Sequence, residues 1–239
     1  MNYFGPKIFI DLQNLVNNYQ KLVEKINGLS VMATVKANAY GHGAVEISKA
    51  LEKEGVRYLA VFTIDEAIEL RDSGIKSDIF IYSKMDPNRL KEVEENDLTI
   101  NVSSFDDLNT LNDFHGKIKA HLKFDTGMTR LGIPFIKAED FLKKAINTSS
   151  LNIEGLYSHF ATADEGELSY AKNQLDQFNE ILKIADHLEI KPKFIHCSNS
   201  GAILNLPESR FNMVRAGMLL YGAFPSDEVP HNISIEPVM

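Results

Sequence analysis

The sequence predicts a (β/α)8 barrel of parallel strands from three observations. From Ser30 onward, short β-rich runs alternate with helical patterns, which is typical of parallel strands joined by crossover helices. Eight such runs fit in the chain, the number that closes a barrel. Most are apolar on both faces, as expected where helices cover a parallel sheet. An open doubly wound sheet is the competing fold, although no Gly-x-Gly-x-x-Gly follows the first strand, which disfavours its dinucleotide-binding form.

Residues 7–27 open with a short apolar piece, Ile8-Phe9-Ile10, after which Asp11 caps an amphipathic helix that Gly28 ends. The predicted strands that follow are residues 31–35, 58–62, 78–82, 98–102, 118–124, 153–157, 193–197 and 211–214. The helical patterns between them are residues 44–53, 64–72, 87–95, 105–112, 136–147, 168–188 and 202–206.

The pattern changes after Gly222. Residues 1–222 are expected to form the barrel. Residues 223–239 contain Pro225 and Pro230, read as a linker, and then a strand-like run over 233–239. We therefore expect a second, β-rich domain to begin there and the natural polypeptide to continue.

Composition narrows the function classes. The 239 residues are 44% hydrophobic and 24% charged, with a net charge of −8, which disfavours a nucleic-acid or anionic-membrane surface. One cysteine, Cys197, excludes an intrachain disulfide and a cysteine-cluster metal site. No apolar run reaches membrane-spanning length and no signal-peptide pattern is present, so a cytoplasmic protein is the simplest expectation.

Reactive side chains are sought at the carboxyl ends of the strands, where barrels carry their sites. Lys36 ends the first strand. A buried ammonium loses solvation and its pKa falls, which makes a lysine nucleophilic. The alternative is a lysine that reaches past the strand end into water. The side chains that follow the other strands include Arg130, His159, Ser198, Asn199, Ser200, Arg215, Gly217 and Tyr221.

A phosphate site is indicated beside this lysine. Ser200 and Gly201 open a helix after the seventh strand and Gly217 follows the eighth, the usual barrel arrangement for a phosphate. A lysine nucleophile, a phosphate site and few carboxylates suit pyridoxal phosphate. Simpler explanations exist for single residues: Arg130 pairing with Asp125, His159 as a satisfied barrel-end histidine and Ser200 as a helix N-cap.

Five motifs resemble alanine racemases. Residues 35–43, Val-Lys-Ala-Asn-Ala-Tyr-Gly-His-Gly, are similar to their pyridoxal-phosphate lysine motif. Residues 123–132, Lys-Phe-Asp-Thr-Gly-Met-Thr-Arg-Leu-Gly, resemble their second signature. Residues 158–164, 198–200 and 214–222 also match in order, and the resemblance runs from about Ile10 to Met239. It implies that the barrel is of the kind called fold type III in pyridoxal-phosphate enzymes.

The resemblance implies a role for each matching residue. Lys36 would form the Schiff base with pyridoxal 5'-phosphate and act as the base for the α-proton of the D-enantiomer. Arg130 would contact the cofactor's phenolic oxygen and the substrate carboxylate, with Met128 also at the substrate. Lys123 matches a lysine that is carbamylated in many members. The remaining cofactor contacts would be Tyr40, Asn199, Ser200, Gly217, Met218 and Tyr221, with Arg215 on the pyridine nitrogen and His159 supporting it.

The arginine at the ring nitrogen has a chemical consequence. A guanidinium only donates hydrogen bonds, so the nitrogen facing Arg215 must be unprotonated. An unprotonated ring is a weaker electron sink, which suits racemisation and disfavours decarboxylase or transaminase chemistry.

The resemblance also implies what these residues lack. In alanine racemases the second base is a tyrosine of a C-terminal β-domain from the partner subunit of a homodimer. We therefore expect alanine racemisation that supplies D-alanine for peptidoglycan, but poor activity from these 239 residues alone. One alternative is a single-domain pyridoxal-phosphate carrier or homeostasis protein. A metal-dependent barrel lyase is disfavoured by the few carboxylates and histidines at strand ends, and no metal is expected.

Overall fold

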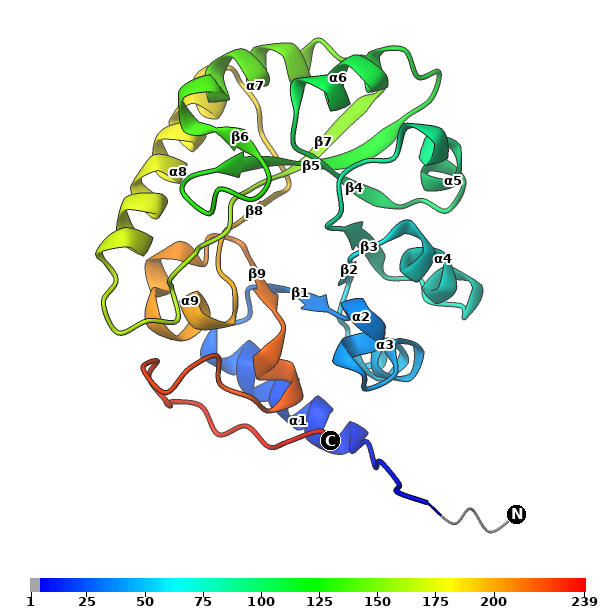
Figure 1. The fold of residues 1–239 in the computed structure, drawn as a ribbon, viewed down its shortest axis with the longest axis vertical. Helices are drawn as coiled ribbons and strands as arrows, with labels where there is room; N and C mark the ends of the chain where they lie inside the picture. The colour runs from blue at the N-terminus through cyan, green and yellow to red at the C-terminus, as the bar shows by residue number, and fades with distance from the viewer. Residues whose placement is uncertain (1–4) are drawn as a thin grey trace.

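A computed structural model describes residues 5–239, and in it helices surround a nearly closed ring of parallel strands (Figure 1). The strand order is β8-β7-β5-β4-β3-β2-β1-β9, with every pairing parallel, which confirms the predicted barrel. The strands are β1 (Ser30–Thr34), β2 (Tyr58–Val61), β3 (Asp78–Ile81), β4 (Thr99–Val102), β5 (Ile118–Asp125), β7 (Leu151–Tyr157), β8 (Phe194–His196) and β9 (Met213–Ala216).

The helices are α1 (Leu12–Lys25), α2 (Lys36–Tyr40), α3 (Ala44–Lys53), α4 (Ile64–Asp72), α5 (Leu90–Glu95), α6 (Phe105–Asn112), α7 (Ala138–Ile146), α8 (Ser169–His187) and α9 (Ser200–Asn205). Short 3-10 turns are η1 (Pro87–Arg89), η2 (Phe135–Lys137), η3 (Pro207–Ser209) and η4 (Met218–Tyr221). Asp11 caps α1 as predicted, because its carboxylate accepts from the backbone of Gln13 and Asn14. In residues 5–239 no helix combines the length and the apolar character needed to cross a bilayer.

Some predicted boundaries were wrong for identifiable reasons. The last strand was expected over residues 211–214, but Phe211 has a φ of 46°, outside strand geometry, and β9 starts at Met213. The helix expected at 202–206 begins at Ser200 because the Asn199 side chain caps it. The two-residue strand β6 (Ile133–Pro134), which pairs with the end of β5, was not predicted.

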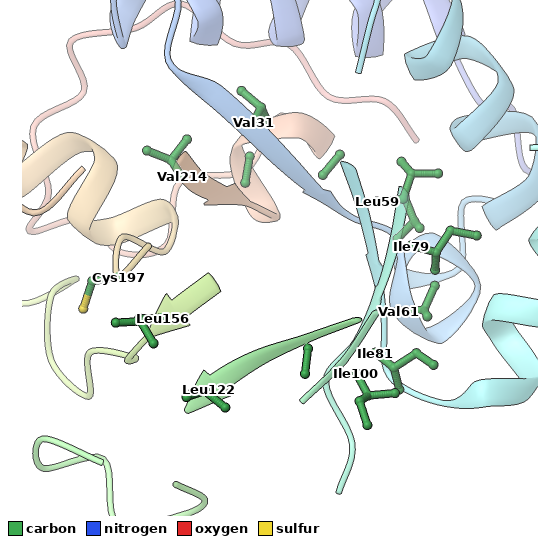
Figure 2. Packing of buried hydrophobic residues seen from close by; sticks show 14 of the residues in the cluster. Val31, Leu59, Val61, Ile79, Ile81, Ile100, Leu122, Leu156, Cys197 and Val214 are labelled. Atoms are coloured by element: carbon green, nitrogen blue, oxygen red, sulfur yellow. The ribbon is translucent and has the colours of Figure 1, made fainter. Parts of the chain in front are cut away.

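Alternate residues of each strand face two different environments. The outward residues form a continuous aliphatic layer beneath the helices, part of which Figure 2 shows: Val31, Leu59, Ile79, Ile100, Leu122 and Val214. The inward residues form a separate cluster of Met32, Tyr58, Ala60, Phe80, Tyr157 and Met213. The expectation of strands apolar on both faces was wrong for β4 and β5, which place Thr99, Asn101, His121 and Lys123 in the buried interior.

The ring closes between β8 and β9, which form no regular ladder. The backbone N–H of Arg215 donates to the Ser198 carbonyl at 2.9 Å. The Asn212 side chain, just before β9, makes the hydrogen bonds to β8 that a neighbouring strand backbone would otherwise make. Its Oδ1 accepts from Ile195 N at 2.7 Å and its Nδ2 donates to the Lys193 carbonyl at 3.0 Å. One backbone bond and the side chains of Asn212 and Arg215, the latter donating to the Cys197 carbonyl at 2.9 Å, therefore join the two strands.

Residues 223–239 leave the barrel and return along α1 (Figure 1). Asn18 of α1 is buried and forms two hydrogen bonds to the backbone of Glu236. It donates to the Glu236 carbonyl at 2.8 Å and accepts from Glu236 N at 2.8 Å. The strand-like run over 233–239 forms no strand here, because its backbone bonds go to α1 and to Tyr221. The division at residue 222 stays a prediction.

Candidate active site

A cavity of about 580 Å³ opens at the carboxyl ends of the strands. Its wall brings together ten of the twelve predicted site residues: Lys36, Tyr40, Lys123, Arg130, His159, Asn199, Ser200, Arg215, Gly217 and Met218. Met128 and Tyr221 lie outside the wall. Most of these residues were predicted from their places at strand ends, whereas Lys123 and Met218 were predicted from the family resemblance alone, and the structure brings both groups to one cavity.

Lys36 stands between β1 and an unusual turn. The next four residues, Ala37 to Tyr40, all have φ near +53°, so α2 is a left-handed turn rather than an ordinary helix. Left-handed backbone costs about 1–2 kcal/mol for each residue with a Cβ. Such concentrated strain is a feature of functional sites. Burial and then the charge of Arg130 lower the pKa of Lys36, while Glu66 opposes this.

Arg215 is buried on β9 with its guanidinium held on two sides. Nη1 donates to His196 Nδ1 at 2.7 Å, and Nη2 lies 2.8 Å from His159 Nδ1. Nη2 also reaches the Ser158 and Cys197 carbonyls, each at 2.9 Å. No described residue accepts from Nε or from the second hydrogen of Nη1, so these donors remain for the cavity.

The guanidinium dictates the tautomers of the neighbouring histidines. Because it only donates, His159 and His196 must each accept through an unprotonated Nδ1. His196 then carries its proton on Nε2 and donates to His121 Nδ1 at 2.8 Å. Burial, followed by the charge of Arg215, lowers the pKa of His121 to about 3 and those of His159 and His196 well below their usual value. All three rings are therefore neutral donors or acceptors near pH 7.

Lys123 points inward from β5 and is 7% exposed. Its Nζ lies 4.3 Å from the centre of the Tyr157 ring. Burial, then Arg215 and Arg130, lowers its pKa to about 7. A large fraction of this lysine is therefore an uncharged amine at neutral pH, which is rare for a lysine.

The opposite end of the cavity contains small groups and hydroxyls. Ser200 Oγ accepts from Gly217 N at 3.3 Å, while Asn199 rather than Ser200 caps α9. The N-cap explanation for Ser200 was therefore wrong. A Cβ on Gly217 would lie 3.1 Å from Tyr40 Oη, so a larger residue here would press on this hydroxyl.

Of the two predicted residues outside the wall, Tyr221 contacts a wall residue and Met128 lies in a neighbouring loop. Tyr221 packs edge-on against Tyr40, with ring centres 5.2 Å apart, and donates to the Thr34 carbonyl at 2.9 Å. Met128 lies in the loop after β5, where Asp125 accepts from Gly127 N and Thr129 N. Asp125 thus caps its own loop and forms no ion pair with Arg130 among the described residues, so that simpler explanation was also wrong.

Sequence reasoning missed Tyr82 and Tyr157 in the cavity wall and His121 and His196 behind it. Their signal was the alternation along each strand: every one of them occupies an inward position. Within residues 5–239, no group of three His, Cys, Asp or Glu side chains could hold a metal ion.

Comparison with known proteins places this geometry in a family. The family sequence model described as alanine racemase, N-terminal domain, matches residues 10–225 of this chain. The alanine racemase of Methanococcus maripaludis is 39% identical over 237 residues, which cover 96% of this chain and 64% of that protein. Alanine racemase 1 of Caldanaerobacter subterraneus is 36% identical, with 98% and 62% covered.

Solved structures agree. Alanine racemase from Clostridium difficile in complex with cycloserine superposes with a TM-score of 0.90 at 34% identity, covering 96% of this chain and 65% of that one. The Bacillus anthracis enzyme with bound L-Ala-P gives 0.89 at 35% identity, covering 98% and 64%. The chain thus spans somewhat less than two thirds of these relatives, and it belongs to the alanine racemase N-terminal domain family.

Proposed function

We propose that this chain is the cofactor- and substrate-binding barrel of an alanine racemase, which interconverts L- and D-alanine with pyridoxal 5'-phosphate on Lys36. One observation carries the proposal. A single cavity brings together a lysine of lowered pKa, two arginines and a hydroxyl-lined end. We further propose that the D-alanine produced is used for peptidoglycan.

The residues present fit pyridoxal phosphate. Arg215 lines the cavity and retains N–H groups that no described residue accepts, which would donate to an acceptor such as a pyridine nitrogen. Ser200 and the side-chain-free Gly217 leave space and donors for a phosphate beside Tyr40. Asn199 and Met218 border the same end. When bound, the cofactor supplies an electron-accepting ring that acidifies the α-hydrogen of an amino acid attached to it.

The chain's own groups then divide the work. Lys36 would hold the cofactor and move the proton at the α-carbon of the D-enantiomer, and its lowered pKa favours the neutral amine that both tasks require. Arg130 would bind the substrate carboxylate with a fork of donors. Arg215 would stay protonated and donate to the ring nitrogen, with His159 and His196 fixing its plane.

We propose that Lys123 is carbamylated. An uncharged amine reacts with carbon dioxide to form a carbamate and release a proton, and burial keeps much of Lys123 uncharged near pH 7. The carbamate would place a negative charge where Arg130 and Arg215 now disfavour a positive one. It would thereby hold Arg130 in place.

We propose that the second base is not supplied by these 239 residues. None of the three tyrosines of the cavity wall suits this role: Tyr157 donates to Asn101 inside the barrel, the Tyr82 hydroxyl lies 3.4 Å from that of Thr34, and burial raises the pKa of Tyr40 to about 12. A homodimer in which a partner subunit contributes the missing tyrosine would complete the pair. Met128 would lie near the substrate. Tyr221 would help to place Tyr40 at the cofactor, because the two rings are packed together.

Covalent capture tests the lysine. The chain is mixed with pyridoxal phosphate, reduced with borohydride and digested, and the labelled peptide is expected to contain Lys36. Lys36→Ala should lose both the label and the visible absorption band. Lys84→Ala is the matched control, because Lys84 is also a lysine of the cavity wall. Label that persists in Lys36→Ala would overturn the assignment.

Solvent-deuterium exchange tests the single base. With Lys36 as the only base, the α-hydrogen of D-alanine should exchange far faster than that of L-alanine, with little net racemisation. Family-like racemisation by the 239 residues would contradict the missing second base. No exchange of either enantiomer by a chain that binds the cofactor would favour the carrier alternative.

A further inference from the structure

The left-handed turn behind Lys36 needs support from outside itself. Four successive residues with a Cβ, Ala37 to Tyr40, adopt a conformation that such residues avoid. Only Asn38 belongs to a type that tolerates it, and its side chain accepts from Ala44 N at 2.8 Å. Ala39 is fully buried, but Ala37 is exposed and gains little from packing. Local preference alone would therefore not maintain this turn.

The missing support comes from α4. Glu66 Oε1 accepts the backbone N–H of Ala37 at 2.7 Å, in the residue directly after Lys36. Glu66 Oε2 accepts from Phe62 N at 2.6 Å and from Thr63 N at 3.1 Å. One carboxylate thus joins the end of β1 to the end of β2. Bonds from backbone N–H groups to a carboxylate are the stronger, charge-assisted kind.

We propose that Glu66 is a positioning residue, which holds the left-handed turn through Ala37 and so fixes where Lys36 enters the cavity. The proposal rests on the proposed function for the role of Lys36, but not for the turn itself. Capping of α4 and support of the turn can be tested separately, because Thr63 takes part only in the first. Its hydroxyl accepts from Glu66 N and caps α4 without contacting the turn.

The same carboxylate also affects the charge of Lys36. Glu66 raises the pKa of Lys36, whereas burial and Arg130 lower it. The Tyr82 ring, whose centre lies 5.9 Å from Nζ, and the neutral His159 are also near Lys36, and Tyr40, Lys123 and Arg215 line the same cavity. Removal of the Glu66 charge should therefore shift the titration of Lys36 downward, while a shorter acid should largely preserve it.

Hydrogen exchange of the cofactor-free chain tests the turn directly. In Glu66→Ala the amides of residues 37–41 should exchange about tenfold faster or more, because one charge-assisted bond and its strain relief are lost. Thr63→Ala should accelerate only the first turn of α4. Equal exchange of residues 37–41 in the two variants would overturn the proposal.

The pH dependence of cofactor capture tests the effect on Lys36. Glu66→Gln keeps the length but loses the charge, and its amide cannot accept from both sets of N–H groups. Capture should then follow a lower pKa than in the wild type. Glu66→Asp keeps the charge, but its shorter side chain cannot reach Ala37 N. This variant should therefore retain the pH profile of capture, while its amides at residues 37–41 still exchange rapidly. Identical profiles for Gln and wild type would also count against the proposal.

These readouts separate two kinds of failure. A wild-type chain that never captures the cofactor on Lys36 would refute the proposed function while leaving the exchange result interpretable. Capture on Lys36 with unaltered exchange in Glu66→Ala would refute the positioning role alone.

Discussion

Leu122 and His121 are neighbours on β5, yet they belong to two different regions of the molecule. Leu122 lies in the aliphatic layer between strands and helices. His121 lies inside the ring, 2.8 Å from His196 and stacked on Phe80 at 4.9 Å. Both are fully buried. Burial is equal, but one region is held by packing and the other by directed hydrogen bonds.

The difference shows how one strand serves stability and chemistry together. The outer layer needs only volume and apolar surface, so most of the hydrophobic free energy arises there. The inner layer holds Lys123, Arg215 and the histidines, whose desolvation must be offset by bonds between them. Substitutions in the outer layer should therefore lower stability through lost packing, and those in the inner layer through unpaired polar groups or altered titration.

The largest expected effect is in the outer layer. Leu122→Ala should lower the free energy of unfolding by about 2–5 kcal/mol, because it removes a fully buried side chain and leaves a cavity. Urea unfolding measures this loss. Affinity for pyridoxal phosphate should stay close to wild type in the folded population, and a selective loss of cofactor binding would contradict the separation of the layers.

The second effect is a pH dependence from the inner layer. The pKa of Lys123 is lowered from 10.5 to about 7, so between these values the unfolded chain binds more protons than the folded one. Stability should therefore rise with pH through this window, on the order of 1 kcal/mol for each pH unit, with the full cost present below it.

Lys123→Met is the control, because it removes the titrating group and keeps an apolar stem. Unfolding curves of the two proteins, recorded in bicarbonate-free buffer, should converge as pH increases. Parallel curves would show that Lys123 is not desolvated as described.

The smallest effect comes from one inner hydrogen bond. His121→Ala removes the acceptor for His196 Nε2 and should cost about 1–3 kcal/mol, the range for a buried donor left unpaired. His121→Asn restores an acceptor near the Nδ1 position and should recover part of the loss. Equal losses in both variants would indicate that volume rather than the bond matters.

The fold could be predicted well from the sequence because the patterns that indicate it are local. Alternation of strands and helices and the residues at strand ends can be recognised within short windows, and these predicted the barrel and most of the site residues found in the cavity wall. Lys123 and Met218 were predicted from the family resemblance instead. The pair of Lys36 and Arg215 was accessible because β1 and β9 are adjacent once the ring closes.

What escaped prediction depends on contacts between distant segments. His121 and His196 are 75 residues apart, and nothing near either indicates that their rings meet. The left-handed turn runs through Ala37 and Ala39, alanines that favour ordinary helix, so tertiary bonds override local preference. The same holds for Asn212, whose role as a substitute strand partner is visible only in three dimensions.

The seam between β8 and β9 has a consequence for how the barrel responds to occupancy. Arg215 closes the ring with its backbone N–H and spans the same gap with its guanidinium, which binds the Cys197 carbonyl. A ligand that takes up the remaining hydrogens of this side chain binds the closed ring in preference to an opened one, and so stabilises it by mass action. Binding in the cavity and closure of the ring are therefore coupled through one side chain, and cofactor binding should make the contact between β8 and β9 harder to open.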